Sequence, residues 1–179
     1  MKAAPSGLAD ARGLRVAILR SEFNPAVVEG LVAGARRALL EMGGSPDDWT
    51  EVSVPGAFEL PIGAKAMAVS GGVDCVVALG AVIRGETDHY EHIARAATDG
   101  LAAVARETGV PIGFGVLTVD QESMAVARSG EGTGNKGAEA ARAAVAMVHV
   151  VRRFPTSPRP EGRRKGSSSR RRTALRGRG

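Results

Sequence analysis

The segment from Gly85 to His92 combines an anion-binding pattern with titratable side chains. Gly85, Glu86 and Thr87 follow an apolar run that ends at Leu79, and a helix is expected to open at Thr87 or Asp88. The backbone N–H groups and the positive end of a helix start favour phosphate groups. His89 falls in the first turn, where the helix dipole favours the neutral imidazole that accepts a proton. This pattern predicts a phosphate site with a proton-transfer residue beside it.

Other interpretations of these residues stay open at this point. An ordinary strand-to-helix turn carrying an idle surface histidine would show the same local pattern. His89 and His92 lie three residues apart on the expected helix, so they could share a metal ion, but no third ligand stands near them. The single cysteine, Cys75, falls inside an apolar run, where a small buried core residue is expected. The sequence therefore predicts no metal and no other cofactor.

One cation and three aromatic residues complete the candidate binding residues. Arg128 ends an expected short helix, where it can hold a phosphate or simply stabilise the helix C-terminus. Phe23, Phe58 and Phe114 fall in or next to strand ends, where rings can stack on a flat heterocycle or pack in the core. These residue types suit a ligand that has both a phosphate group and a heterocycle.

The elements that must position these residues alternate between strands and helices. Apolar runs predict strands, and helical periodicity with boundary residues predicts helices. The expected strands are 14–19, 49–54, 74–79 and 111–119, and the expected helices are 25–42, 59–70, 88–107, 121–128 and 136–153. Such alternation predicts an α/β fold: a three-layer α/β/α sandwich with a flavodoxin-like, four-stranded parallel sheet and helices on both faces. Ligands of such sheets bind beyond the carboxyl ends of the strands.

Two helix starts have recognisable boundary residues. Asn24 is expected to cap the first helix, with Pro25 at its first position. Asp88 and Glu91 have capping-box spacing at the start of the helix that carries His89. Both segments follow a strand, so both are expected at the ligand-binding edge of the sheet.

Charge is distributed unevenly along the 179 residues. Residues 152–179 hold eleven Lys and Arg and one acid, whereas residues 1–151 hold 13 basic and 18 acidic residues. We expect an N-terminal arm (1–13), one α/β domain (14–153) and a basic, disordered tail (154–179). The tail would bind nucleic acid only through unspecific charge attraction. With no apolar run near 20 residues and no secretory pattern at the start, a cytoplasmic protein without membrane contacts is expected.

Five short motifs occur in order along the expected domain. They are Phe23-Asn24, Val54–Pro61, Gly80–Tyr90, Gly113–Thr118 and Gly134–Gly137. Through them, the chain from about Leu14 to Val151 resembles the 6,7-dimethyl-8-ribityllumazine synthase family. The resemblance implies condensation of 5-amino-6-(D-ribitylamino)uracil with 3,4-dihydroxy-2-butanone 4-phosphate, the penultimate step of riboflavin biosynthesis. The alternative is a flavin- or lumazine-binding module of the same fold without turnover.

The resemblance also implies individual roles. His89 matches the proton-transfer histidine, and Arg128, helped by Glu86 and Thr87, matches the phosphate-binding set. The residues that match contacts to the heterocycle and its ribityl chain are Phe23, Ala57, Phe58, Glu59, Ala81, Val82, Ile83, Phe114 and Lys136. In this family Phe114 and Arg128 would come from a neighbouring subunit.

Assembly is likewise implied by the resemblance. Family members form homopentamers, and some close twelve pentamers into a hollow 60-subunit icosahedral capsid, with riboflavin synthase as a possible cargo. The expected loop over residues 129–135 is short and glycine-rich, like that of shell-forming members. We therefore expect the shell rather than a free pentamer. The basic tail has no counterpart among the family motifs.

Overall fold

Four apolar segments form one parallel sheet in the computed structural model, which describes residues 9–154. The strands are β1 (Val16–Ser21), β2 (Trp49–Val54), β3 (Cys75–Ile83) and β4 (Ile112–Val119). Their order in the sheet is β2-β1-β3-β4, and every pairing is parallel. The predicted sheet is therefore confirmed. Residues 1–8 of the expected arm and 155–179 of the expected tail lie outside the described residues.

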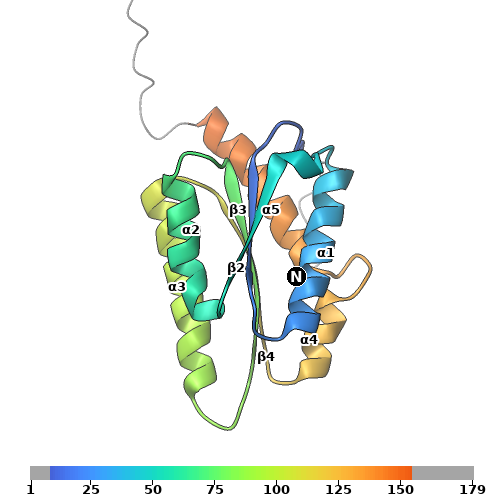
Figure 1. The fold of residues 1–179 in the computed structure, drawn as a ribbon, viewed down its shortest axis with the longest axis vertical. Coiled ribbons are helices and arrows are strands. Elements are labelled where there is room, and N and C mark those ends of the chain that lie inside the picture. The colour runs from blue at the N-terminus through green and yellow to red at the C-terminus, as the bar shows by residue number, and fades with distance from the viewer. Residues whose placement is uncertain (1–8, 155–179) are drawn as a thin grey trace, which may run out of the picture.

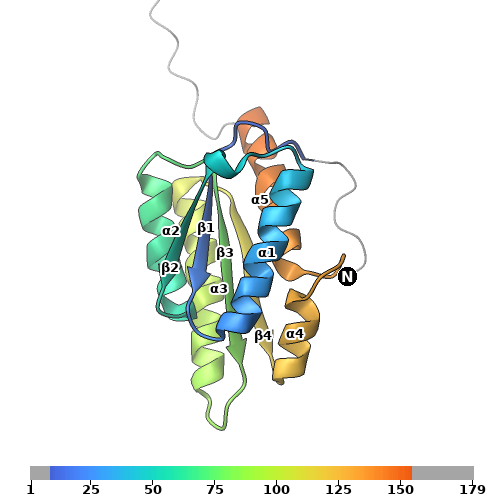
Figure 2. The ribbon, with the colours of Figure 1, turned by 45° about the vertical axis from the view of Figure 1, so that its right-hand side comes forward.

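Helices cover both faces of this sheet (Figures 1 and 2). One face carries α1 (Pro25–Glu41), α4 (Glu122–Ser129) and α5 (Lys136–Arg153), and the other carries α2 (Leu60–Val69) and α3 (His89–Thr108). Two short 3₁₀ turns, η1 (Pro46–Asp48) and η2 (Ala57–Glu59), complete the described elements. The predicted α/β/α sandwich is confirmed, and each predicted helix is present within two residues of its expected bounds.

The central strand β3 explains why its sequence is continuously apolar. Cys75, Val77 and Leu79 pack into the core beneath α1 and α5. Val76 and Ala78 pack on the opposite side, beneath α2 and α3. A strand covered on both faces has no polar alternation, because successive side chains point to opposite faces that are both buried.

β3 is longer than predicted, and the extra residues matter for the site. Its pairing with β1 ends at Leu79, whereas its pairing with β4 continues to Ile83. The last four residues of β3 therefore have a strand neighbour on one side only. The segments that follow β1, β2 and β3 meet around this half-open end of the sheet.

Both predictions of side-chain capping were wrong. Asn24 precedes α1 in a left-handed conformation (φ 57°, ψ 56°) and its side chain does not cap the helix. Asp88 has helical dihedrals (φ −69°, ψ −2°) and also makes no side-chain cap. A capping side chain needs an extended backbone at the cap residue so that its oxygen can reach back to the first-turn N–H groups. Pro25 does occupy the start of α1, as expected.

Candidate active site

A pocket of about 680 Å³ opens at the carboxyl end of the sheet. That volume lies in the usual range for small-molecule sites. Four segments contribute to it: the turn after β1, the turn containing η2, the end of β3 and the first turns of α3. The lining residues are Phe23, Asn24, Gly56, Ala57, Phe58, Glu59, Ala81, Val82, Ile83, His89, His92 and Ile93.

Two exposed phenylalanines give the pocket its aromatic surface. Phe23 is 69% exposed and Phe58 is 58% exposed, although both are large and apolar. A Cβ atom added at Gly56 would lie 3.2 Å from the Phe23 ring and 3.1 Å from a carboxylate oxygen of Glu59. Gly56 thus lets the turn after β2 approach the turn after β1 closely. Open ring faces of this kind suit a flat, conjugated ligand.

The end of β3 presents unpaired backbone groups to the pocket. The Val76 N–H donates to Pro111 (3.0 Å) and the Arg84 N–H donates to Val119 (2.9 Å), so even-numbered residues of β3 bond toward β4. Peptide groups alternate in direction along a strand, so those of Ala81 and Ile83 face the β1 side. Because β1 ends at Ser21, Ile83 has no strand partner there. Its N–H and C=O are available to a planar ligand with complementary groups.

The turn before α3 is the segment for which the sequence predicts an anion site. Residues 85–88 are exposed, and His89 is the first residue of α3. Arg84 anchors this turn: its Nε lies 2.7 Å from Asp120, a terminal nitrogen lies 3.7 Å from Glu91, and its guanidinium lies 5.0 Å from the Tyr90 ring centroid. These contacts tie the turn to the first turn of α3 and to the end of β4. Backbone N–H groups at a helix start of this kind, together with the positive helix end, can stabilise an anion.

The pocket brings together eight of the sequence-predicted site residues. They are Phe23, Ala57, Phe58, Glu59, Ala81, Val82, Ile83 and His89. Glu86 and Thr87 lie in the adjoining exposed turn and are not among the lining residues. Phe114, Arg128 and Lys136 do not line the pocket of their own chain either.

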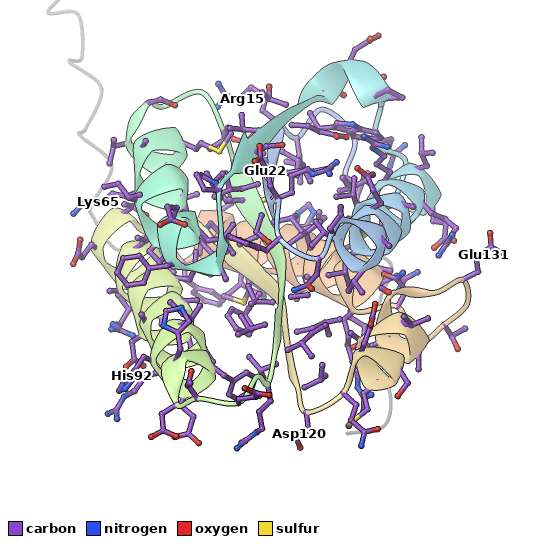
Figure 3. The ribbon with its side chains drawn as sticks, turned by 60° about the horizontal axis from the view of Figure 1, so that its bottom comes forward. Arg15, Glu22, Lys65, His92, Asp120 and Glu131 are labelled. Atoms are coloured by element: carbon purple, nitrogen blue, oxygen red, sulfur yellow. The ribbon has the colours of Figure 1, made fainter. Side chains whose placement is uncertain are left out.

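Those last three residues lie on other elements. Phe114 is the third residue of β4, toward the amino end of the strand, so it lies inside a strand as one of the two predicted positions allowed. Arg128 is on α4, where its guanidinium donates to the Met124 carbonyl at 3.0 Å. Lys136 opens α5 and pairs with Glu139 at 2.7 Å. Figure 3 brings the pocket end forward, with His92 on α3 at one side of the sheet, Asp120 at the end of β4, and α4 on the other side.

Sequence reasoning did not assign Asn24, Gly56, His92 or Ile93 to the pocket. Helical spacing was a usable signal for His92 and Ile93, which lie one turn beyond His89 and face the same way. For Asn24 the signal was its place in the segment after β1, which was expected at the ligand-binding edge of the sheet, but its side chain was assigned to a helix cap. Its side-chain N–H donates to the Ala81 carbonyl at 2.9 Å, a contact between residues 57 positions apart.

Glu59, His89 and His92 are titratable residues of the pocket lining, so the pocket can supply groups for proton transfer. Among residues 9–154, no group of three or more His, Cys, Asp or Glu side chains could hold a metal ion. Burial, with the nearby Asp74 charge, raises the pKa of the Cys75 thiol to about 12, so it is not a nucleophile at neutral pH. In the same described part of the chain, no helix is long and apolar enough to cross a bilayer.

Comparison with known proteins gives the same picture over most of the chain. Residues 13–152 match the family described as 6,7-dimethyl-8-ribityllumazine synthase. A protein of that name from Nitratidesulfovibrio vulgaris (strain DSM 19637 / Miyazaki F) is 47% identical over 145 residues, covering 81% of this chain and 93% of the relative. Another, from Leifsonia xyli subsp. xyli (strain CTCB07), is 49% identical over 145 residues, covering 80% and 89%.

Proposed function

This chain belongs to the 6,7-dimethyl-8-ribityllumazine synthase family, and we propose on that basis how its pocket carries out the family's reaction. The enzyme is a transferase. It condenses 5-amino-6-(D-ribitylamino)uracil with 3,4-dihydroxy-2-butanone 4-phosphate and releases phosphate and water. The product is 6,7-dimethyl-8-(D-ribityl)lumazine, and the reaction is the penultimate step of riboflavin biosynthesis.

In this proposal the pyrimidine lies along the end of β3. Its ring stacks on Phe23, and its alternating N–H and C=O groups pair with the free peptide groups of Ile83. Ala81 and Val82 form the adjoining wall. The ribityl chain runs past η2, where Ala57, Phe58 and Glu59 offer backbone groups and a carboxylate to its hydroxyls. The apolar wall thus contacts the ring of the substrate, and the polar turn contacts its ribityl chain.

The butanone phosphate lies at the start of α3. The turn that holds Glu86 and Thr87 receives the phosphate, because free N–H groups and the helix dipole stabilise negative charge there. The amine then attacks the ketone to form a Schiff base with loss of one water, phosphate leaves, and the ring closes with loss of a second water. Most of the acceleration comes from holding the two substrates together in a productive orientation.

His89 moves the protons in this sequence. It is an exposed residue of the first turn of α3, next to the phosphate turn, and it lines the pocket. Its imidazole accepts a proton from the reacting ketone and returns one to a leaving group, a role worth about 10²–10⁴-fold. One observation supports this most: His89, the Phe23 ring face and the open β3 edge line a single pocket beside an anion-binding turn.

We propose that a neighbouring subunit completes each site. Phe114 and Arg128 are matched family positions, yet neither lines the pocket of its own chain. Both are at least partly exposed, so a second copy of the chain can contact them. In a ring of subunits, Arg128 of one copy reaches the phosphate in the next, Phe114 covers the heterocycle, and Lys136 lies near the ribityl chain.

The assembly that we propose is a homopentamer closed further into a 60-subunit icosahedral shell. Large apolar side chains exposed on the single chain, including Ile62, Val126 and Met147, support burial between subunits. The loop between α4 and α5 is short, with Gly132 at φ 113°, and by its resemblance to the loop of shell-forming family members it supports closure of pentamers into a shell. Riboflavin synthase is the proposed cargo. A single cysteine in the whole chain fits a reducing compartment, and we place the enzyme in the cytoplasm.

Incubation with both substrates, followed by lumazine fluorescence, tests the activity. His89→Ala is expected to lower kcat by about 10- to 10³-fold, because orientation and phosphate binding survive the change. His149→Ala is the matched control, since His149 lies on α5 and contacts the Asp10 carbonyl instead of the pocket. A non-catalytic binding module would bind the lumazine and form none. Unchanged turnover in His89→Ala would remove this residue from the mechanism.

A further inference from the structure

Asn24 has the most unusual backbone conformation at the pocket. Among the described residues it is the one non-glycine residue with a positive φ, and it is followed by Pro25. Asparagine adopts this left-handed conformation more readily than most residues with a side chain, but the backbone is still strained there. A following proline adds to this, because its ring disfavours helical backbone at the preceding residue. Such strain persists only where surrounding contacts hold it, and it concentrates at functional sites.

A long-range hydrogen bond holds Asn24 in place. Its side-chain Nδ2 donates to the Ala81 carbonyl at 2.9 Å. That carbonyl faces the β1 side of β3, two residues beyond the last β1–β3 pair, Arg20 with Leu79. A longer β1 would supply a backbone N–H at this point. The Asn24 amide therefore takes the position of the donor that the strand no longer provides.

The two partners of this bond belong to the two surfaces that would hold the heterocycle. Asn24 directly follows Phe23, whose ring is 69% exposed over the pocket. Ala81 is two residues before Ile83, whose free peptide groups face the same pocket. The bond thus fixes the distance between the stacking ring and the hydrogen-bonding edge. Strand pairing with β1 has already ended at Leu79, and this bond occupies the Ala81 carbonyl while the edge at Ile83 stays open.

We propose that Asn24 is a positioning residue for the pyrimidine substrate. It acts through Phe23 and through the β3 edge, and its own amide is occupied by Ala81, so it does not serve as a ligand to the substrate. This inference rests on the proposed assignment of the pyrimidine to the β3 edge. The butanone phosphate, placed at the start of α3, does not depend on the bond.

The test compares two substitutions that keep the left-handed backbone accessible. Asn24→Gly removes the donor, and Asn24→Asp replaces it with oxygens that face the Ala81 carbonyl. Loss of one hydrogen bond predicts that Asn24→Gly raises the KM for the ribitylaminouracil about 3- to 10-fold. Asn24→Asp raises it by more than about 10-fold, because two acceptors then oppose each other. The KM for the butanone phosphate and kcat change by less than about twofold in both, since neither acts through this bond.

Pro25→Ala is the matched control. It relieves the restriction on the preceding residue and keeps the amide, so the KM for the pyrimidine is expected to stay within about twofold of wild type. A general loss of structure would instead raise both KM values and lower the melting temperature in parallel. An unchanged pyrimidine KM in both Asn24 variants, or an equal rise for both substrates, overturns the positioning role.

The same comparison is made without turnover by titrating the lumazine product and following its fluorescence. The Kd is expected to follow the order wild type, Asn24→Gly, Asn24→Asp, from tightest to weakest. Because this readout does not involve His89, it separates the two ideas. An inactive protein that still shows this order contradicts the proposed chemistry alone, and an active protein with three equal Kd values contradicts the role of Asn24 alone.

Discussion

Mixing two inactive variants gives the sharpest test of a site shared between subunits. His89 lies in the pocket at the start of α3, whereas Arg128 lies on α4, on the opposite face of the sheet. If each site takes His89 from one subunit and Arg128 from the next, His89→Ala and Arg128→Ala damage different halves of it. A site that combines the undamaged halves of the two variants is intact.

The expected recovery follows from random mixing around a ring. In an equal mixture, half of the subunits supply a normal His89, and half of their neighbours supply a normal Arg128. About a quarter of the sites are therefore complete, whatever the number of subunits in the closed ring. The assay is unfolding and refolding of the variants together, followed by the initial rate of lumazine fluorescence. Each variant refolded alone gives the background.

A second mixture provides the control. Wild type mixed equally with the His89→Ala, Arg128→Ala double variant is expected to keep about a quarter of its activity if sites are shared, but about half if each chain holds a whole site. The reasoning is refuted if the two single variants together show only background activity while the double variant with wild type shows half. Size-exclusion chromatography confirms in each case that mixed oligomers have formed.

Three further predictions concern phosphate binding, pH and the tail. Arg128→Ala should raise the KM for the butanone phosphate about 10- to 100-fold and that for the pyrimidine little, because a charge-assisted contact contributes about 1.5–3 kcal/mol; equal effects in steady-state kinetics would place Arg128 elsewhere. Burial raises the pKa of Asp74, but hydrogen bonds from Arg15 and the charges of Arg15 and Arg152 outweigh it and lower the pKa overall. Asp74→Asn should therefore lower the free energy of unfolding by about 1–2 kcal/mol at pH 7. This difference should fade as the pH falls below about 3.9, the pKa of an unfolded Asp, and then through the lower pKa of Asp74 in the folded protein. Urea titrations that show equal stability of the two proteins at pH 7 would contradict this. Residues 155–179 hold eight arginines and one lysine. Their removal should leave turnover unchanged, because α5 ends at the opposite end of the molecule from the pocket (Figure 1), and should abolish salt-sensitive retention on heparin. A truncated protein that is folded but inactive would show that the tail serves catalysis.

The proposed shell also has a direct measurement. Sedimentation at low and at moderate salt should show a species near sixty subunits, with salt promoting closure if basic tails repel one another at pentamer contacts. One species near five subunits in both buffers would rule out the shell. A single active subunit would overturn the shared site as well.

The sequence alone determined the layer pattern of this protein. The strand from Cys75 is continuously apolar, amphipathic helices precede and follow it, and the connections are short. Together these features predict a parallel sheet that is covered by helices on both faces. Local patterns also placed the turn of residues 85–88 before a helix and His89 in the first turn of that helix, because strand end, glycine and helix all lie within about ten residues. Such features depend on near neighbours, which a sequence shows directly.

Only the tertiary structure decided which of these residues share a pocket. Asparagine is a residue type typical of helix caps, yet the side-chain amide of Asn24 donates to the Ala81 carbonyl, 57 positions away. It does so because β1, which would otherwise supply a backbone N–H to that carbonyl, has already ended. Phe114 and Arg128 carry the right chemistry but lie outside the pocket of their own chain. Where a strand stops pairing, and which face of the sheet a helix covers, depends on contacts between distant segments, and these are settled when the layers pack together.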